Sequence, residues 1–135
     1  MSGTTPAYAA ALIAAAMMHG TAFQAPATVY AALTVDDSTD AAAGTECSDA
    51  TYARVPVTTA DLFSRTDAIL TTIIDIVWPL ATVSYDVHDV EFYDSLDDSG
   101  SNNRVLPFIP ISPNVTVPAG VTFKLPAGSG TETVS

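Results

Sequence analysis

The sequence predicts a mainly β protein, an antiparallel β-sandwich or jelly-roll-like fold with one N-terminal α-helix, in a single domain of residues 1–135. Two observations carry this prediction. Apolar and polar residues alternate with a period of two over several short segments, as in strands with one buried and one solvated face. Turn sequences rich in Gly, Pro, Asn and Asp separate these segments, which is typical of sandwiches and barrels.

The first expected element is a helix over residues 5–20, which forms an N-terminal helix or arm. Thr5 suits the N-cap, Pro6 the first helical position, and Gly20 the position just after the helix. The alanine-rich interior has high helix propensity. This helix would either pack on the protein's own core or dock on a neighbouring subunit.

Strands are expected next at residues 27–35 and 51–57, on either side of an acidic loop at 36–49. In the second strand Tyr52 and Arg54 should share one face, because side chains alternate along a strand.

The following segment has mixed signals. Its first part, 59–70, predicts a loop or a short helix, whereas β-branched and aromatic residues at 72–78 favour a strand.

Residues 81–111 predict two strands joined by an acidic turn rich in Ser, Asn and Gly. In the first strand the apolar alternation runs through Val87 and resumes at Val90, one residue out of phase. A slip of one residue would turn the core side chains outward, so a β-bulge near His88–Asp89 is expected.

Prolines and glycines complete the prediction. Proline cannot donate a ladder hydrogen bond, so Pro56 indicates an edge strand, and Pro107 and Pro110 indicate an edge strand or a bend. Two Pro-Ala-Gly turns flank a last strand, at 118–120 and 126–128. The sandwich is therefore assigned to residues 27–128, and residues 129–135 to a flexible tail.

Composition narrows the classes of function. The chain carries 15 acidic and 4 basic residues, a net charge of −11, and Lys124 is its only lysine. Such a surface repels phosphate backbones, so we expect no nucleic-acid partner. The repulsion is screened by salt, which suits a saline environment.

No apolar run reaches the ~20 residues that a spanning helix needs, so we expect no membrane partner. No Lys or Arg precedes Arg54, which argues against a signal peptide and for release in the host cytoplasm.

The candidates for chemistry are few. Cys47 is the only cysteine, with His19 and His88 as conceivable bases, but no motif surrounds it, so a loop cysteine without catalytic role is expected. His88 and Asp86 share a strand face and form a weak candidate metal pair.

Two acidic groupings complete the survey. The run from Asp94 to Gly100 resembles a calcium loop but lacks EF-hand spacing, so a solvated turn is the simpler interpretation. Asp89 and Glu91 share a strand face, yet nothing marks the cleft that a glycosidase pair requires. We therefore expect no catalytic, cofactor or metal site.

Five motifs in order resemble a family of small tailed-phage virion proteins, described as capsid cement or head decoration proteins and loosely as tail-fibre proteins. They are Ala25–Thr34 (APATVYAALT), Thr45–Thr58 (TECSDATYARVPVT), Trp78–Asp94, Arg104–Ile111 and Val117–Gly128 (VPAGVTFKLPAG).

The resemblance implies a virion subunit without enzymatic activity, placed on the capsid surface as a cement protein that bridges major capsid subunits. Its partners would be the major capsid protein and neighbouring copies in a homo-oligomer, a dimer or trimer. A tail, fibre or baseplate component is the first alternative. A calcium-dependent binding module or an enzyme with a loop site is the second.

Overall fold

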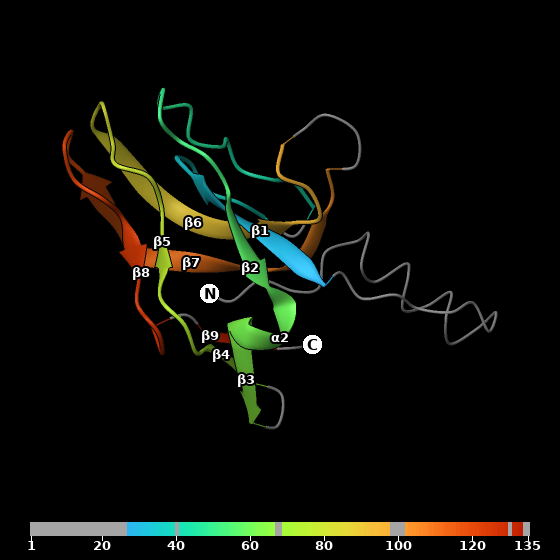
Figure 1. Cartoon of the computed structure of the whole chain (residues 1–135). Coiled ribbons are helices and arrows are strands. Elements are labelled where there is room, and N and C mark those ends of the chain that lie inside the picture. Colours follow the sequence, from blue (N-terminus) through green and yellow to red (C-terminus); the bar gives the residue numbers. More distant parts are fainter. Residues whose placement is uncertain (1–26, 40, 67–68, 98–101, 130, 134–135) are drawn as a thin grey trace.

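The largest sheet in the computed structural model of this chain has four antiparallel strands in the order β2-β1-β6-β7 (Figure 1). Its strands are β1 (Thr28–Thr34), β2 (Val55–Thr58), β6 (Tyr85–Tyr93) and β7 (Arg104–Val117). The structure describes residues 27–39, 41–66, 69–97, 102–129 and 131–133. The predicted helix at 5–20 lies outside these residues.

Two smaller sheets accompany the large one. One pairs β5 (Ile76–Val77) with β8 (Lys124–Leu125), and the other has the order β3-β4-β9. The remaining elements are α2 (Thr59–Leu62), β3 (Phe63–Thr66), β4 (Ile69–Thr72) and β9 (Thr131–Thr133). All strand pairings of the described residues are antiparallel.

The hydrophobic core lies between the four-stranded sheet and the β5–β8 pair. Leu33 and Phe92 from the sheet belong to the same buried cluster as Trp78 and Phe123 from the opposite layer. The rings of Trp78 and Phe123 lie 5.5 Å apart between centroids. The Trp78 indole N–H donates a 3.1 Å hydrogen bond to the carbonyl of Ala31, so the two layers are also joined by a polar contact.

The irregularity expected near His88–Asp89 is confirmed as a register shift between β6 and β7, with the extra residues on β7. The pairing of the two strands is regular up to Val87↔Val115 and resumes at Asp89↔Pro110, so four residues of β7 face one residue of β6. Val87 and Val90 are an odd number of residues apart, yet both are fully buried in the core. The strand therefore changes phase where the sequence places the slip.

Several other predictions are confirmed. The structure is mainly β, with a strand β1 inside 27–35, and the proline-containing strands β2 and β7 form the two edges of the four-stranded sheet. Both Pro-Ala-Gly turns form, with Gly120 and Gly128 at φ near +83° and +82°. In each turn the N–H of the following residue donates to the proline carbonyl, so glycine occupies the position that needs a positive φ.

The middle of the chain differs from the prediction. The strand expected at 72–78 is wrong: β4 ends at Thr72, and β5 begins only at Ile76. The N–H of Ile73 still donates to the carbonyl of Leu62, one residue beyond the β3–β4 pairing, and the chain then enters another sheet at β5. A short helix does form at 59–62, but the β3–β4 pair that follows was not expected.

The strand at 51–57 is also shorter than predicted, because β2 begins only at Val55. Strand β9, at 131–133, pairs with β4 where the sequence predicts only a tail. No helix in the described part of the chain has the length and apolarity to cross a membrane.

Candidate functional site

The face of the four-stranded sheet that points away from the core is polar and buried. Along β6, Asp89, Glu91 and Tyr93 alternate with the core residues Val90 and Phe92. Glu91 is 0% exposed and Asp89 4% exposed. A buried carboxylate is costly unless it has hydrogen-bonding or charged partners, so this face depends on the groups that cover it.

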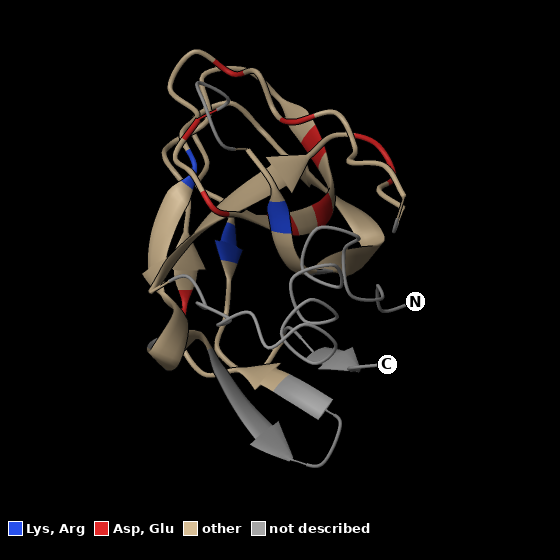
Figure 2. Cartoon of the chain, turned by 90° about the vertical axis from the view of Figure 1, so that its right-hand side faces the viewer, with Lys and Arg blue, Asp and Glu red and all other residues tan. Residues whose placement is uncertain are grey.

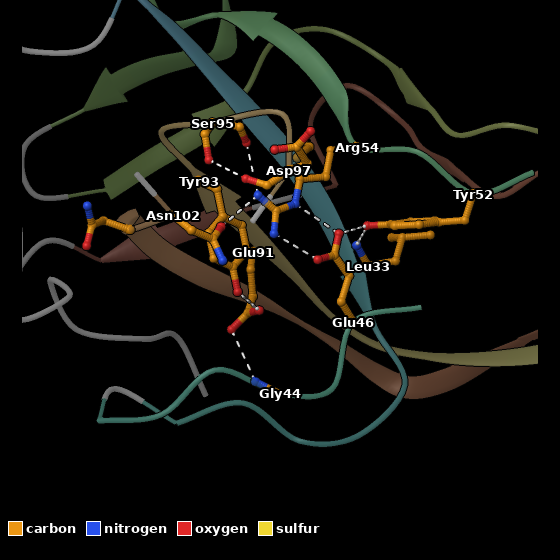
Figure 3. Close-up of polar contacts among 12 residues, drawn as sticks. Leu33, Gly44, Glu46, Tyr52, Arg54, Glu91, Tyr93, Ser95, Asp97 and Asn102 are labelled. Carbon is orange, nitrogen blue, oxygen red and sulfur yellow. Dashed lines mark hydrogen bonds and ion pairs between the residues drawn. The ribbon is translucent and has the colours of Figure 1, made fainter. Parts of the chain in front are cut away.

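Arg54 is the central residue of this polar face (Figure 3). Its side chain is only 4% exposed, and its Nε and Nη2 atoms donate to the two carboxylate oxygens of Glu46 at 2.9 and 2.8 Å. Its Nη1 donates to the Ser95 carbonyl at 3.0 Å and to Asn102 Oδ1 at 2.8 Å. The guanidinium thus ties the acidic loop to the turn between β6 and β7.

Two tyrosines extend this contact. The Arg54 guanidinium carbon lies 4.0 Å from the centroid of the Tyr93 ring, a cation–π distance. Tyr52 Oη donates to Glu46 Oε2 at 2.6 Å and accepts the N–H of Leu33 at 3.0 Å. Burial would lower the pKa of Arg54, but the hydrogen bonds and charge of Glu46 outweigh it, so the pKa is raised.

Glu91 connects this group to a second arginine. Its Oε1 accepts the Tyr93 hydroxyl at 2.9 Å, while its Oε2 lies 3.2 Å from Arg104 Nη1 and 3.4 Å from the Gly44 N. Burial raises the pKa of Glu91, against the lowering effect of the Tyr93 hydrogen bond. Arg104 Nη1 also donates to the Thr39 carbonyl at 2.8 Å. The acidic loop is therefore fastened over the sheet at both of its ends.

Asp49 and Asp36 close loops by accepting backbone and hydroxyl hydrogens. Asp49 accepts the Thr82 hydroxyl at 2.6 Å and the Val83 N–H at 2.9 Å, and the Thr82 hydrogen bond is the largest cause that lowers the Asp49 pKa. Asp36 accepts the Thr45 hydroxyl at 2.6 Å, which lowers the Asp36 pKa. Both carboxylates thus hold loop backbone in place.

The structure separates the candidates that the sequence singled out. Cys47 is buried, and burial raises the pKa of its thiol, which disfavours the nucleophilic thiolate. His19 lies outside the described residues. His88 Nδ1 lies 2.9 Å from Asp37 Oδ1, whereas Asp86 accepts the Thr116 hydroxyl at 2.6 Å. His88 and Asp86 therefore have separate partners.

The acidic turn after β6 has a structural role at its start. Asp94 accepts the N–H and side-chain amide of Asn103 at 2.9 and 3.1 Å, which closes the turn between β6 and β7. Residues 98–101 of the predicted calcium-like run lie outside the described residues. Among the described residues, no group of three or more His, Cys, Asp or Glu side chains is arranged to hold a metal ion.

The polar network itself was missed by sequence reasoning. The sequence placed Tyr52 with Arg54, and Asp89 with Glu91, on shared faces, but gave no sign that the acidic loop folds over them. An arginine next to an edge strand in a chain with 15 acidic and only 4 basic residues was the available signal, because the guanidinium fork suits multidentate binding to carboxylates.

Two open hollows flank the network. One, of about 410 Å³, has Arg54, Cys47 and Leu96 in its lining. The other, of about 610 Å³, lies beside β7, with His88, Phe108 and Pro110 in its lining. The titratable groups of the network are bound to one another, so the arrangement can hold loops in fixed positions and present a rigid surface.

One family model matches the chain over residues 4–133, and it describes the podophage GP4 fiber I protein gp80. The comparison with curated proteins gives no match.

Proposed function

Because this chain belongs to the podophage GP4 fiber I protein gp80 family, and is therefore a phage virion protein, we propose that it is a structural subunit of a virion fibre. The family match over residues 4–133 is the observation that carries the proposal. The family's description names a fibre, which supports the tail or fibre alternative over the capsid cement role expected from the sequence.

The geometry supports a structural role that depends on binding other proteins rather than on catalysis. Arg54 and Glu46 hydrogen-bond each other, and Glu91 is bound by Tyr93, Arg104 and the Gly44 backbone. Groups held in this way give a rigid loop surface, which suits a subunit that must keep its shape in a particle. Its partners in this proposal are further copies of the chain and neighbouring fibre proteins.

Location in the particle tests the proposal. Purified virions are labelled with a gold-conjugated antibody against the chain, and its copy number is measured against the major capsid protein. A fibre subunit places the label on the appendages at a small fraction of the capsid copy number. Label spread over the head, at a copy number close to that of the capsid protein, would favour the cement role instead. Absence from purified virions would refute both.

A further inference from the structure

The larger of the two hollows is made by the register shift between β6 and β7. At the shift, the four β7 residues Ile111–Asn114 lie opposite His88 alone. All five residues belong to the lining of the hollow of about 610 Å³, which we call the β7 hollow. Asp89 of β6 and Asp37 of the acidic loop also belong to the lining. The extra length of β7 therefore forms a wall that faces two carboxylates.

Both carboxylates have capacity left for a ligand. The Asp37 side chain is 87% exposed, and among the described residues only its Oδ1 has a partner, His88 Nδ1 at 2.9 Å. Asp89 is 4% exposed, and in the described part of the chain Ser38 alone supplies its hydrogen bonds, with the backbone N–H 2.7 Å from Oδ2. Burial raises the pKa of Asp89. A cation placed beside it would compensate a buried charge that has no basic partner in the fold.

The rest of the lining suits the stem of a basic side chain. Phe108, Pro110 and Ile111 contribute apolar surface, against which the methylene groups of lysine or arginine can pack. Asn114, whose Nδ2 lies 3.3 Å from His88 Nε2, adds a side-chain amide. The described lining contains no lysine or arginine, so an anionic ligand would meet two carboxylates and no basic side chain.

From this lining we infer that the β7 hollow binds an arginine or lysine side chain of a different protein. Most described acidic residues lie in the acidic loop and on β6, red at the top of Figure 2, and this field attracts a basic surface. A second copy is a poor occupant. Its Arg54 and Arg104 are held in the polar network, and its exposed Lys124, beside Asp75, would arrive with a net charge of −11. The inference rests on the proposed function for its source, a neighbouring virion protein.

Titration of the full-length, ¹⁵N-labelled chain with N-acetyl-arginine amide tests the hollow. The backbone amide signal of His88 and the side-chain amide signals of Asn114 should shift, with half-saturation at about 1–10 mM for so small a ligand. N-acetyl-citrulline amide, which has the same shape without the charge, should leave them in place. N-acetyl-lysine amide should also bind, and more weakly if the planar fork of the guanidinium is recognised.

Three variants localise the binding. Asp37→Asn should weaken it about two- to fivefold, the range of an exposed ion pair. Asp89→Asn, which keeps an acceptor for Ser38, should weaken it at least about tenfold, with a thermal melt to verify its fold. Asp75→Asn is the matched control, because it removes the same charge outside the hollow and keeps Oδ1 as the acceptor of the Ala127 N–H. It should bind like the wild type.

Two results would overturn the inference. One is the absence of a saturating shift in the wild type up to about 100 mM arginine amide. The other is equal weakening by Asp75→Asn and the two hollow variants, which would show attraction to net charge alone. The titration uses the isolated chain, so its outcome is separate from that of the antibody label. Binding by a chain that is absent from virions would keep the site and refute the fibre role, and label on the appendages without binding would do the reverse.

Discussion

Replacing Arg54 by methionine removes the cation from the polar network while keeping a side chain of similar length. Arg54 is 4% exposed and Glu46 28% exposed, so the variant leaves one partly buried carboxylate without its ion pair. It also removes the donors to Ser95 and Asn102. Breaking a buried pair from one side costs about 3–5 kcal/mol. Because Glu46 keeps some contact with water, we expect the lower end of that range, a loss of about 3 kcal/mol in the free energy of unfolding.

Urea unfolding followed by tryptophan fluorescence measures this loss, because Trp78, the only tryptophan, is buried in the core. Lys124→Met is the matched control. It removes the same charge from a side chain that is 52% exposed and 3.9 Å from Asp75, where a surface pair contributes about 0–1 kcal/mol. Adding Glu46→Gln to Arg54→Met should recover part of the loss, with a coupling of about 1–3 kcal/mol. An Arg54→Met variant no less stable than Lys124→Met would refute the reasoning.

Three further outcomes follow from the same contacts. Tyr52→Phe should lower the free energy of unfolding in urea by about 1–3 kcal/mol, since it leaves the Leu33 N–H and Glu46 without a partner; an unchanged midpoint would contradict this. Asp49→Asn should melt at a lower temperature than wild type at pH 7. That difference should shrink as pH falls below 3.8, because a carboxylate with a lowered pKa stabilises the fold only while ionised, and a constant difference would count against it. Raising NaCl from about 0.05 M to about 1 M should raise the melting temperature, since the Debye length shortens from over 10 Å to about 3 Å; no response to salt would show that repulsion within the chain is unimportant.

Local sequence patterns correctly predicted several features of the fold. The phase slip between Val87 and Val90 placed the bulge, because side chains on a strand must alternate between two faces. Pro56 and Pro110 identified the edge strands, because proline lacks a ladder donor. Both kinds of signal are local, since a residue's own backbone chemistry or its immediate neighbours produce them.

The region around Ile73 shows where such signals fail. The residues from 72 to 78 have strand propensity throughout, yet the chain leaves one sheet at Thr72 and joins another at Ile76. Propensity measures fit to a pleated surface, and it cannot say which partner strand supplies that surface. Strand β9, which pairs with β4 across about sixty residues of chain, was missed for the same reason.

The sequence by itself determined an antiparallel β-rich chain with a strongly acidic surface, proline-marked edges and two glycine turns, because composition and short-range stereochemistry suffice for these. Only the tertiary structure decided that Arg54, Glu46 and Tyr93 meet, and that the acidic loop closes over buried Glu91. Those contacts join residues up to about fifty positions apart, and their stability depends on excluding water from a face that exists only once the sheet has formed.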